Sequence, residues 1–153
     1  MSLTGQAAPE FELPDADMQM VRSADFSGAP YVLYFYPKDD TPGCTMEAQE
    51  FSDLSDEFAA LGVSVLGVSR DTCVSHAAFR DKFGLTVRLL ADVEGQLCEA
   101  YGVWQEKEKN GEKKMGIVRS TFIVDGSGVV RHAFDQVKPK GHAEAVLELA
   151  RAL

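Results

Sequence analysis

The sequence predicts an α/β fold in which a central mixed β-sheet is flanked by helices and preceded by an amino-terminal β-hairpin. Two continuous apolar runs, 31–36 and 63–68, are typical of strands that are buried on both faces. A segment with apolar residues at helical spacing follows each run. Near the end of the chain, two strand-like runs flank the turn 125–128. Because helices alternate with buried strands first and a hairpin comes last, this order favours a mixed sheet between helical layers.

The remaining elements follow from local patterns. Apolar residues around 11–13 and 18–21, separated by a turn at 14–17, predict the amino-terminal hairpin. The expected strands of the central sheet are 31–36, 63–68, 87–90, 121–124 and 129–133. The expected helices are 44–61, a helix capped by Asp71 that runs to 83, 94–101 and 142–153. The charged run 105–114 is interpreted as a solvated loop, with a partner-docking segment as the alternative.

Composition limits the class of protein. The 153 residues suit one domain, 1–153, and 45% of them are hydrophobic, which is the globular norm. Fifteen basic against twenty-four acidic residues give a net charge of −9, which repels nucleic acids and anionic membranes. No apolar stretch approaches the roughly 20 residues that span a bilayer. The segment Met1–Gln6 lacks the features of a secretory signal. We therefore expect a protein with neither nucleic-acid nor membrane partners.

The cysteines and histidines argue against a disulfide framework and against a metal site. Cys44, Cys73 and Cys98 are an odd number, and the sequence has neither a Cys-x-x-Cys pair nor a Cys/His cluster at zinc spacing. The three histidines, His76, His132 and His142, share no spacing and are expected at surface or hairpin positions. This pattern favours a reducing cytoplasm as the location of the protein.

The segment around Cys44 is the most informative for chemistry. A buried strand ends at Tyr36, a loop bracketed by prolines follows, and Cys44 lies near the first turn of a long predicted helix. Helix amino termini carry partial positive charge and free amide donors, both of which favour a thiolate. The alternative for any single cysteine is a small buried hydrophobic residue. A polar, turn-rich loop is a poor place for a core residue, so the context favours a reactive thiol.

A lowered pKa alone gives such a thiol little advantage. Lowering a thiol pKa from ~8.5 to ~6 raises the thiolate fraction at pH 7 about 30-fold. The same change lowers the intrinsic nucleophilicity about 13-fold, so the net gain is only about two-fold. A fast thiol enzyme must therefore also stabilise the charge that develops on the leaving group. Thr41, three residues before Cys44, offers a hydroxyl from the same loop; a cation from elsewhere in the chain would complete such a site.

These residues carry a resemblance to a known family. The pattern Pro37-x-x-x-Thr41-x-x-Cys44 resembles the peroxiredoxin signature. The stretch Thr41-Pro-Gly-Cys-Thr45 is similar to the peroxiredoxin Q, or bacterioferritin comigratory protein, group. The similarity covers nearly the whole chain, through the further blocks Gly5–Leu13, Gly67–Asp71, Tyr101–Trp104 and Arg119–Asp125.

The resemblance implies a thioredoxin-like fold and a peroxidase that uses neither a metal nor a bound cofactor. In such an enzyme Cys44 attacks the peroxide O–O bond and becomes a sulfenic acid. Thr41 positions the peroxide, and Pro37 shields the pocket. Arg119 is the cation that holds the thiolate and binds peroxide oxygen, although an arginine at the start of a strand is, taken alone, more often a surface charge or a member of an ion pair. Glu47, one turn beyond Cys44, either anchors Arg119 or is a solvated helix residue.

The sequence departs from the family pattern at the resolving cysteine. Many members of the group carry a second cysteine five residues after the first, where this chain has Gln49. Others carry it on the helix after the second strand, near Arg80. Cys73 lies on that same helix, at the end expected to share a sheet edge with Cys44. Cys98 is expected to be a core residue. A Cys44–Cys73 disulfide and a one-cysteine cycle therefore both remain open.

The resulting functional hypothesis is a cytoplasmic thiol peroxidase that reduces hydrogen peroxide and organic hydroperoxides. Its partners would be the peroxide and thioredoxin or another thiol reductant, and the group suggests a monomer. Two alternatives remain. A thiol–disulfide oxidoreductase on the same fold would normally need a second cysteine close to Cys44, and a thioredoxin-like interaction module would have no catalytic activity.

Overall fold

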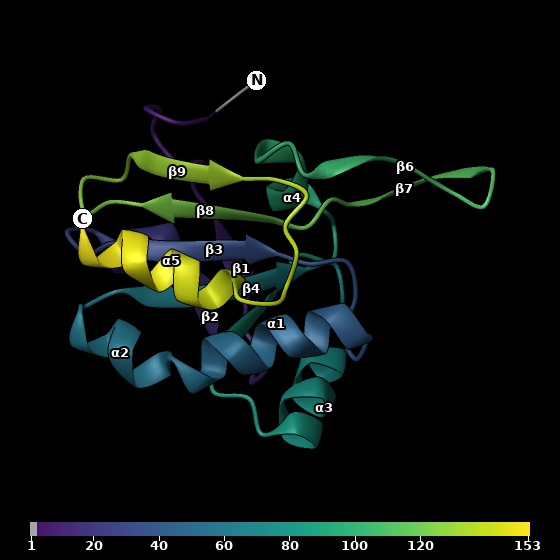
Figure 1. Cartoon of the computed structure of the whole chain (residues 1–153), viewed down its shortest axis with the longest axis horizontal. Helices are drawn as coiled ribbons and strands as arrows, with labels where there is room; N and C mark the ends of the chain where they lie inside the picture. Colours follow the sequence, from purple (N-terminus) through teal and green to yellow (C-terminus); the bar gives the residue numbers. More distant parts are fainter. Residues whose placement is uncertain (1–2) are drawn as a thin grey trace.

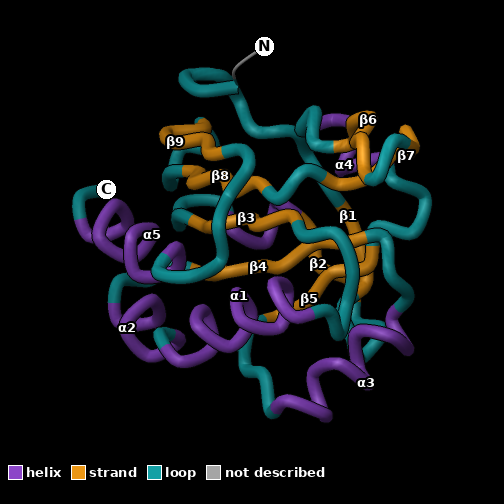
Figure 2. Tube along the Cα trace, turned by 45° about the vertical axis from the view of Figure 1, so that its right-hand side comes forward, coloured by secondary structure: helices purple, strands orange, loops and turns teal. Residues whose placement is uncertain are grey.

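The centre of the molecule is a five-stranded mixed sheet with the strand order β5-β4-β3-β8-β9 (Figures 1 and 2). This computed structural model describes residues 3–153; Met1 and Ser2, the first residues of the segment considered for a secretory signal, lie outside them. Strands β3, β4 and β5 are parallel, whereas β8 and β9 run antiparallel to their neighbours. The strands are Tyr31–Phe35 (β3), Ser64–Ser69 (β4), Arg88–Ala91 (β5), Ser120–Val124 (β8) and Val130–Phe134 (β9). The predicted mixed sheet is confirmed.

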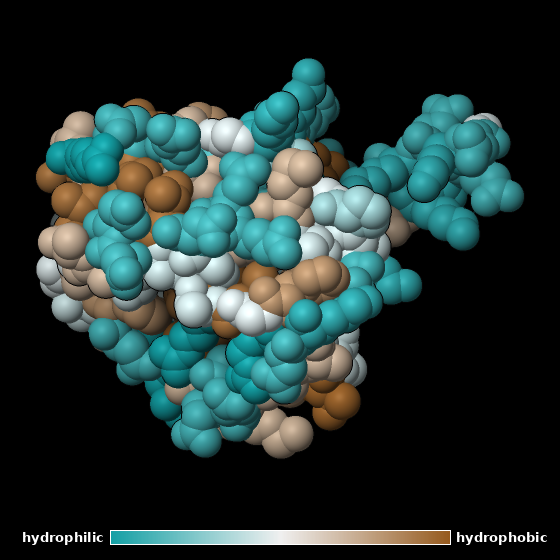
Figure 3. Space-filling view, turned by 60° about the horizontal axis from the view of Figure 1, so that its bottom comes forward, coloured by the Kyte–Doolittle hydropathy of each residue, from teal (hydrophilic) through white to brown (hydrophobic). Residues whose placement is uncertain are grey.

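Two hairpins stand outside this sheet. Strands β1 (Glu12–Pro14) and β2 (Met20–Arg22) form the predicted amino-terminal hairpin. Strands β6 (Trp104–Lys109) and β7 (Glu112–Ile117) form a second hairpin, so the interpretation of 105–114 as a loop is wrong. Asn110 and Gly111 both have positive φ, at 53° and 80°, and thereby build the tight turn that joins two antiparallel strands. The hairpin projects from the body of the molecule with a mainly hydrophilic surface, as predicted for a solvated segment (Figures 1 and 3).

The helices begin and end close to the predicted positions. They are α1 (Pro42–Asp53), α2 (Ser55–Ala60), α3 (Cys73–Phe83), α4 (Gln96–Ala100) and α5 (His142–Arg151), with a 3-10 turn at Ser23–Phe26. The single helix expected over 44–61 is two helices that meet at Leu54. The expected cap Asp71 is also wrong, because Thr72 occupies that position and its hydroxyl accepts the amide proton of Ser75. None of the helices within 3–153 is both long and apolar enough to cross a bilayer.

The sheet has an apolar core on each face. Figure 2 shows α1, α2 and α5 together on one face, where they pack on Val32, Tyr34 and other residues of β3. The opposite face carries Leu33 and Phe35 of the same strand and is covered by α4 and the amino-terminal hairpin. Strand β3 is therefore buried on both faces, which explains its uninterrupted apolar sequence.

Strand register brings separate segments to one edge of the sheet. Strands β3 and β4 are parallel, so the loops that follow them leave the sheet at the same edge. Strand β8 is antiparallel to β3 and pairs Ser120 with Phe35, so it begins where β3 ends. Arg119, directly before β8, therefore arrives beside the loop that leads from Tyr36 to α1. In open α/β sheets, the carboxyl ends of the parallel strands are the usual place for a functional site.

Candidate active site

Cys44 is the third residue of α1 and is only 2% exposed. Thr41, with extended backbone, is the N-cap of the helix, and its carbonyl accepts the first helical hydrogen bond from the amide of Thr45 at 2.8 Å. Pro42 has no amide proton, and its fixed φ suits the first helical position. The amides of Gly43 and Cys44 precede the helical ladder, so the thiol lies at the positive end of the helix dipole.

Arg119 bridges Cys44 and Glu47. Its Nη2 donates to Cys44 Sγ at 3.2 Å, and its Nη1 donates to Glu47 Oε1 at 2.7 Å. The Arg119 side chain is 15% exposed, and that of Glu47 is fully buried. Burial alone would lower the pKa of the Arg119 guanidinium, but the neighbouring Glu47 and Cys44 raise it above its ordinary value. The structure thus places a permanent cation in direct contact with the thiol sulfur.

Glu47 is a carboxyl group with a strongly altered pKa. Burial raises its pKa from 4.5 to about 7, although the charge and the hydrogen bond of Arg119 act in the opposite direction. Its second oxygen, Oε2, has no hydrogen-bond partner among the residues that the structure describes. The acid form of Glu47 therefore persists up to neutral pH, and Oε1 can still accept from Arg119 in that form.

Glu47→Gln is expected to remove a pH dependence of stability. The folded protein keeps the Glu47 proton up to about pH 7, whereas the unfolded chain releases it near the ordinary value of 4.5. Between these values the folded state binds more protons, so rising pH destabilises it, by about 3 kcal/mol in total. The difference in unfolding free energy between variant and wild type should therefore shift in favour of Glu47→Gln as pH rises from 4.5 to 8. Urea titrations across this range measure it, and parallel pH profiles would contradict the assignment.

Thr41 and Pro37 lie on the loop that precedes α1. The Thr41 hydroxyl donates to the carbonyl of Lys38 at 2.8 Å, so the lone pairs of its oxygen remain available to accept a hydrogen bond. The Thr41 side chain is half-buried, whereas Pro37, directly after Tyr36 at the end of β3, is exposed. Pro37 therefore lies at the rim of the loop.

Two residues near Arg119 were not identified from the sequence. A Cβ atom on Gly43 would lie 3.1 Å from Arg119 Nη2, a tight contact that would push the guanidinium outward by a few tenths of an ångström. Lys107 lies on the projecting hairpin, where its Cδ packs over Gly116 of the facing strand; a Cβ atom added to Gly116 would lie 3.2 Å from it. Burial and the charge of Arg119 lower the Lys107 pKa, whereas Cys44 acts to raise it. The Thr-Pro-Gly-Cys motif points to Gly43, but nothing local to the charged run distinguishes Lys107 from its neighbours.

His142 contributes a neutral group near the site. Its Nε2 lies 2.7 Å from the hydroxyl oxygen of Thr121 on β8. Burial and, to a smaller degree, the charge of Arg119 lower its pKa to about 4. The sequence analysis expected a surface or hairpin histidine here, whereas His142 is half-buried at the first position of α5.

The other two cysteines differ in accessibility. All three cysteines are free thiols. Cys73 is half-buried at the first position of α3, at the sheet edge where β3 and β4 both end. Cys98 is fully buried, and burial together with a hydrogen bond from the thiol to the Asp92 carboxylate raises the pKa of its thiol strongly. The expected core position of Cys98 is confirmed.

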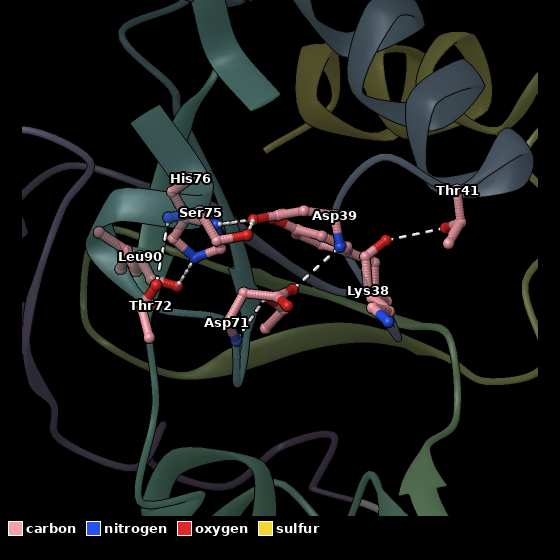
Figure 4. Close-up of polar contacts among 10 residues, drawn as sticks. Lys38, Asp39, Thr41, Asp71, Thr72, Ser75, His76 and Leu90 are labelled. Carbon is pink, nitrogen blue, oxygen red and sulfur yellow. Dashed lines mark hydrogen bonds and ion pairs between the residues drawn. The ribbon is translucent and has the colours of Figure 1, made fainter. Parts of the chain in front are cut away.

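His76 is buried in the core, so its expected surface or hairpin position is wrong. Its ring lies between the Asp39 carboxylate and the carbonyl of Leu90 (Figure 4). Asp39, Asp71 and His76 each offer a ligand atom within 4.8 Å of the others, a spacing that a metal ion could use. Both ring nitrogens of His76, both carboxylate oxygens of Asp39 and Oδ2 of Asp71 already have hydrogen-bond partners in the protein, so the set is a polar network and not a metal site.

Comparisons with known proteins agree with this geometry. The AhpC/TSA family model matches residues 4–133. Peroxiredoxin Bcp of Escherichia coli is 43% identical over 94% of this chain and 92% of its own length. The structure of the bacterioferritin comigratory protein of Xanthomonas campestris superposes with a TM-score of 0.88 at 40% identity, covering 93% of this chain and 90% of that one. Peroxidoxin BcpB of Mycobacterium tuberculosis gives a TM-score of 0.86 at 34% identity, covering 98% and 97%. The fold of the present chain, its Pro37–Cys44 loop and these relatives together show that the chain belongs to the AhpC/TSA family, within the peroxiredoxin Q or bacterioferritin comigratory protein group.

Proposed function

We propose that Cys44 is the nucleophile with which this chain reduces hydrogen peroxide and organic hydroperoxides. As a member of its family the chain is a thiol-dependent peroxidase; the proposal concerns the residues and the substrates. The Cys44 thiolate attacks one peroxide oxygen, so that an S–O bond forms and the O–O bond breaks. The departing oxygen takes up a proton and leaves as water or an alcohol, while Cys44 becomes a sulfenic acid. The contact of Arg119 Nη2 with Cys44 Sγ at 3.2 Å is the observation that carries the proposal.

The surrounding residues take distinct roles in this step. Arg119 stabilises the thiolate and then the negative charge that develops on the peroxide oxygens. Thr41 accepts a hydrogen bond from the peroxide O–H and thereby orients the O–O bond. Glu47 holds Nη1 of Arg119 so that Nη2 faces the sulfur. Pro37 forms the rim of the pocket, and its fixed φ stiffens the loop.

The oxidised enzyme returns to the thiol through a thiol reductant. A first thiol displaces water from the sulfenic acid to form a disulfide, and a second thiol releases Cys44 from it. Thioredoxin or another thiol supplies these electrons, and no metal or bound cofactor takes part.

We place the enzyme in the cytoplasm as a monomer built from one domain, 1–153. Its three free cysteines suit a reducing compartment. The alkyl peroxide reduction activity of the Xanthomonas campestris relative supports the inclusion of organic hydroperoxides.

A peroxide-consumption assay with dithiothreitol as the reductant tests the proposal. Turnover of both hydrogen peroxide and cumene hydroperoxide is expected, with loss of activity after alkylation of Cys44. Reduction of insulin disulfides without peroxide loss would instead indicate a thiol–disulfide oxidoreductase. Inactivity in both assays would leave an interaction module.

Peptide mapping after one equivalent of peroxide is expected to identify the resolving route. The disulfide requires the Cα atoms of Cys44 and Cys73 to come within about 7 Å. Because Cys44 is almost completely buried, we expect the first turn of α1 or α3 to open for this reaction. A Cys44–Cys73 linked peptide indicates the internal route, and its absence together with a persistent sulfenic acid indicates a one-cysteine cycle. Slow resolution by either route should give sulfinic acid under excess peroxide. A linked peptide through Cys98 would contradict its buried, unreactive state.

A further inference from the structure

A network of buried polar groups joins the loop that precedes Cys44 to α3. The Asp39 carboxylate accepts three hydrogen bonds: from the Tyr36 hydroxyl to Oδ1 at 2.6 Å, and from the Ser75 hydroxyl and His76 Nδ1 to Oδ2 at 2.7 and 2.8 Å. The backbone amide of Asp39 donates to Asp71 Oδ2 at 2.9 Å. Figure 4 shows Asp39, Asp71, Ser75 and His76 converging between the loop and the first turn of α3.

The surroundings of His76 fix its protonation. Its Nε2 lies 2.9 Å from the carbonyl oxygen of Leu90, which can only accept, so Nε2 carries a proton. Its Nδ1 lies 2.8 Å from a carboxylate oxygen of Asp39. The same oxygen accepts a hydrogen bond from the Ser75 hydroxyl, and the other oxygen of the carboxylate accepts one from the Tyr36 hydroxyl, so the carboxylate faces Nδ1 as an acceptor. Both ring nitrogens therefore carry protons, and the ring is an imidazolium buried without any exposed surface.

The loop that contains Asp39 depends on such contacts for its conformation. Asp40 has a φ of 56°, a left-handed conformation that side-chain-bearing residues rarely adopt. Asp40 also pairs with Lys82 of α3 at 2.7 Å, although this pair is exposed and therefore weak. The next residue is Thr41, whose hydroxyl and N-cap backbone define the start of α1. The geometry of the Cys44 site thus depends on a strained turn, and contacts between this turn and the α3 segment hold it in place.

We propose that Asp39 and doubly protonated His76 are a positioning pair, a buried ion pair that fixes the 37–41 loop and the first turn of α1 against α3. The pair touches neither the sulfur nor the peroxide. It acts through Thr41 and through the orientation of the helix that carries Cys44. The same contacts hold Ser75, two residues after Cys73, so the pair also restrains the end of α3 that faces the loop. Only the expected effect on the peroxide rate rests on the proposed function.

Ring ¹⁵N-histidine NMR of the wild-type protein tests the ionisation directly. At pH 7 two exchange-protected ring N–H signals are expected from one histidine, and both should vanish in His76→Gln. His132→Gln, the same substitution on a histidine outside the network, should leave both signals in place. One protected ring proton, or a pair that survives in His76→Gln, would overturn the proposal. This measurement needs neither peroxide nor activity, so its outcome is separate from that of the proposed function.

Hydrogen exchange with mass spectrometry tests the positioning role. In His76→Gln the amides of 37–45 are expected to exchange about tenfold faster or more, because a local network limits local opening. Peptides from β8 and α5 should keep their wild-type rates. Unchanged exchange at 37–45, or uniformly faster exchange over the whole chain, would overturn the local role.

A double-mutant cycle tests whether Asp39 and His76 affect the peroxide rate as one unit. Asp39→Asn, His76→Gln and the double variant should each lower the second-order rate with peroxide by about tenfold, since small misplacements of reacting groups cost this much. Alkylation of the unfolded variants with iodoacetamide controls for the amount of free Cys44 thiol. Non-additive losses support a pair that acts as one unit, and fully additive losses contradict it. His132→Gln serves again as the matched control with wild-type rate.

Discussion

Replacing Cys44 with serine is expected to abolish peroxidase activity while leaving the fold intact. The hydroxyl of serine is similar in size but is a far weaker nucleophile at neutral pH, and it does not form a sulfenic acid. A loss of roughly 10³-fold or more is expected, as for the removal of other covalent nucleophiles. The assay follows peroxide consumption with dithiothreitol in stopped flow, and circular dichroism checks the fold. The largest loss should thus come from an atom that is almost completely buried.

Cys98→Ala is the matched control for this experiment. Cys98 is also buried in an apolar cluster, but burial and the neighbouring Asp92 carboxylate raise the pKa of its thiol and so disfavour the thiolate. This variant should therefore keep the wild-type peroxide rate and lose only some stability through a small cavity. Residual turnover of Cys44→Ser above the rate of dithiothreitol alone would contradict the mechanism.

Replacing Arg119 with alanine is expected to lower the second-order rate with peroxide by about 10²- to 10³-fold, the cost of removing one donor that stabilises developing charge. The arithmetic for a generic thiol shows that a shift in ionisation alone changes its reactivity only about two-fold. Most of the loss should therefore concern the peroxide step. Alkylation of Cys44 by iodoacetamide, a neutral reagent without a peroxide bond, should slow much less. Comparing the two rates in the same variant separates the two contributions.

Arg131→Ala is the control for the change in net charge. Arg131 forms an exposed ion pair with Asp125, at a distance of 3.2 Å, and lies outside the site. Its loss should leave both rates unchanged, whereas Arg119→Lys should restore only part of the peroxide rate because lysine lacks the planar fork that reaches two partners. Equal losses in peroxide rate and alkylation rate for Arg119→Ala would show that Arg119 acts on the thiol alone.

The sequence by itself determined the class of the fold and the local setting of Cys44. Strand β3 is recognisable because an uninterrupted apolar run suits a strand buried on both faces. The loop and helix start that follow it are recognisable because Thr41, Pro42 and Gly43 carry local conformational preferences. These features depend on near neighbours in the chain, and such preferences act before any tertiary contact forms. The position of Cys98 in the core follows from the same kind of local pattern.

Only the tertiary structure decided which distant groups meet. Arg119 reaches Cys44, 75 residues earlier in the chain, because β8 pairs with β3 in one register, and neither local sequence specifies that pairing. The pKa of Glu47 near 7 arises from burial, which depends on the packing of the whole α1 face. His76 was expected at a surface or hairpin position, yet it is fully buried against Asp39, 37 residues earlier in the chain. A charged group is buried only where a partner compensates its desolvation, and that partner is supplied by the fold.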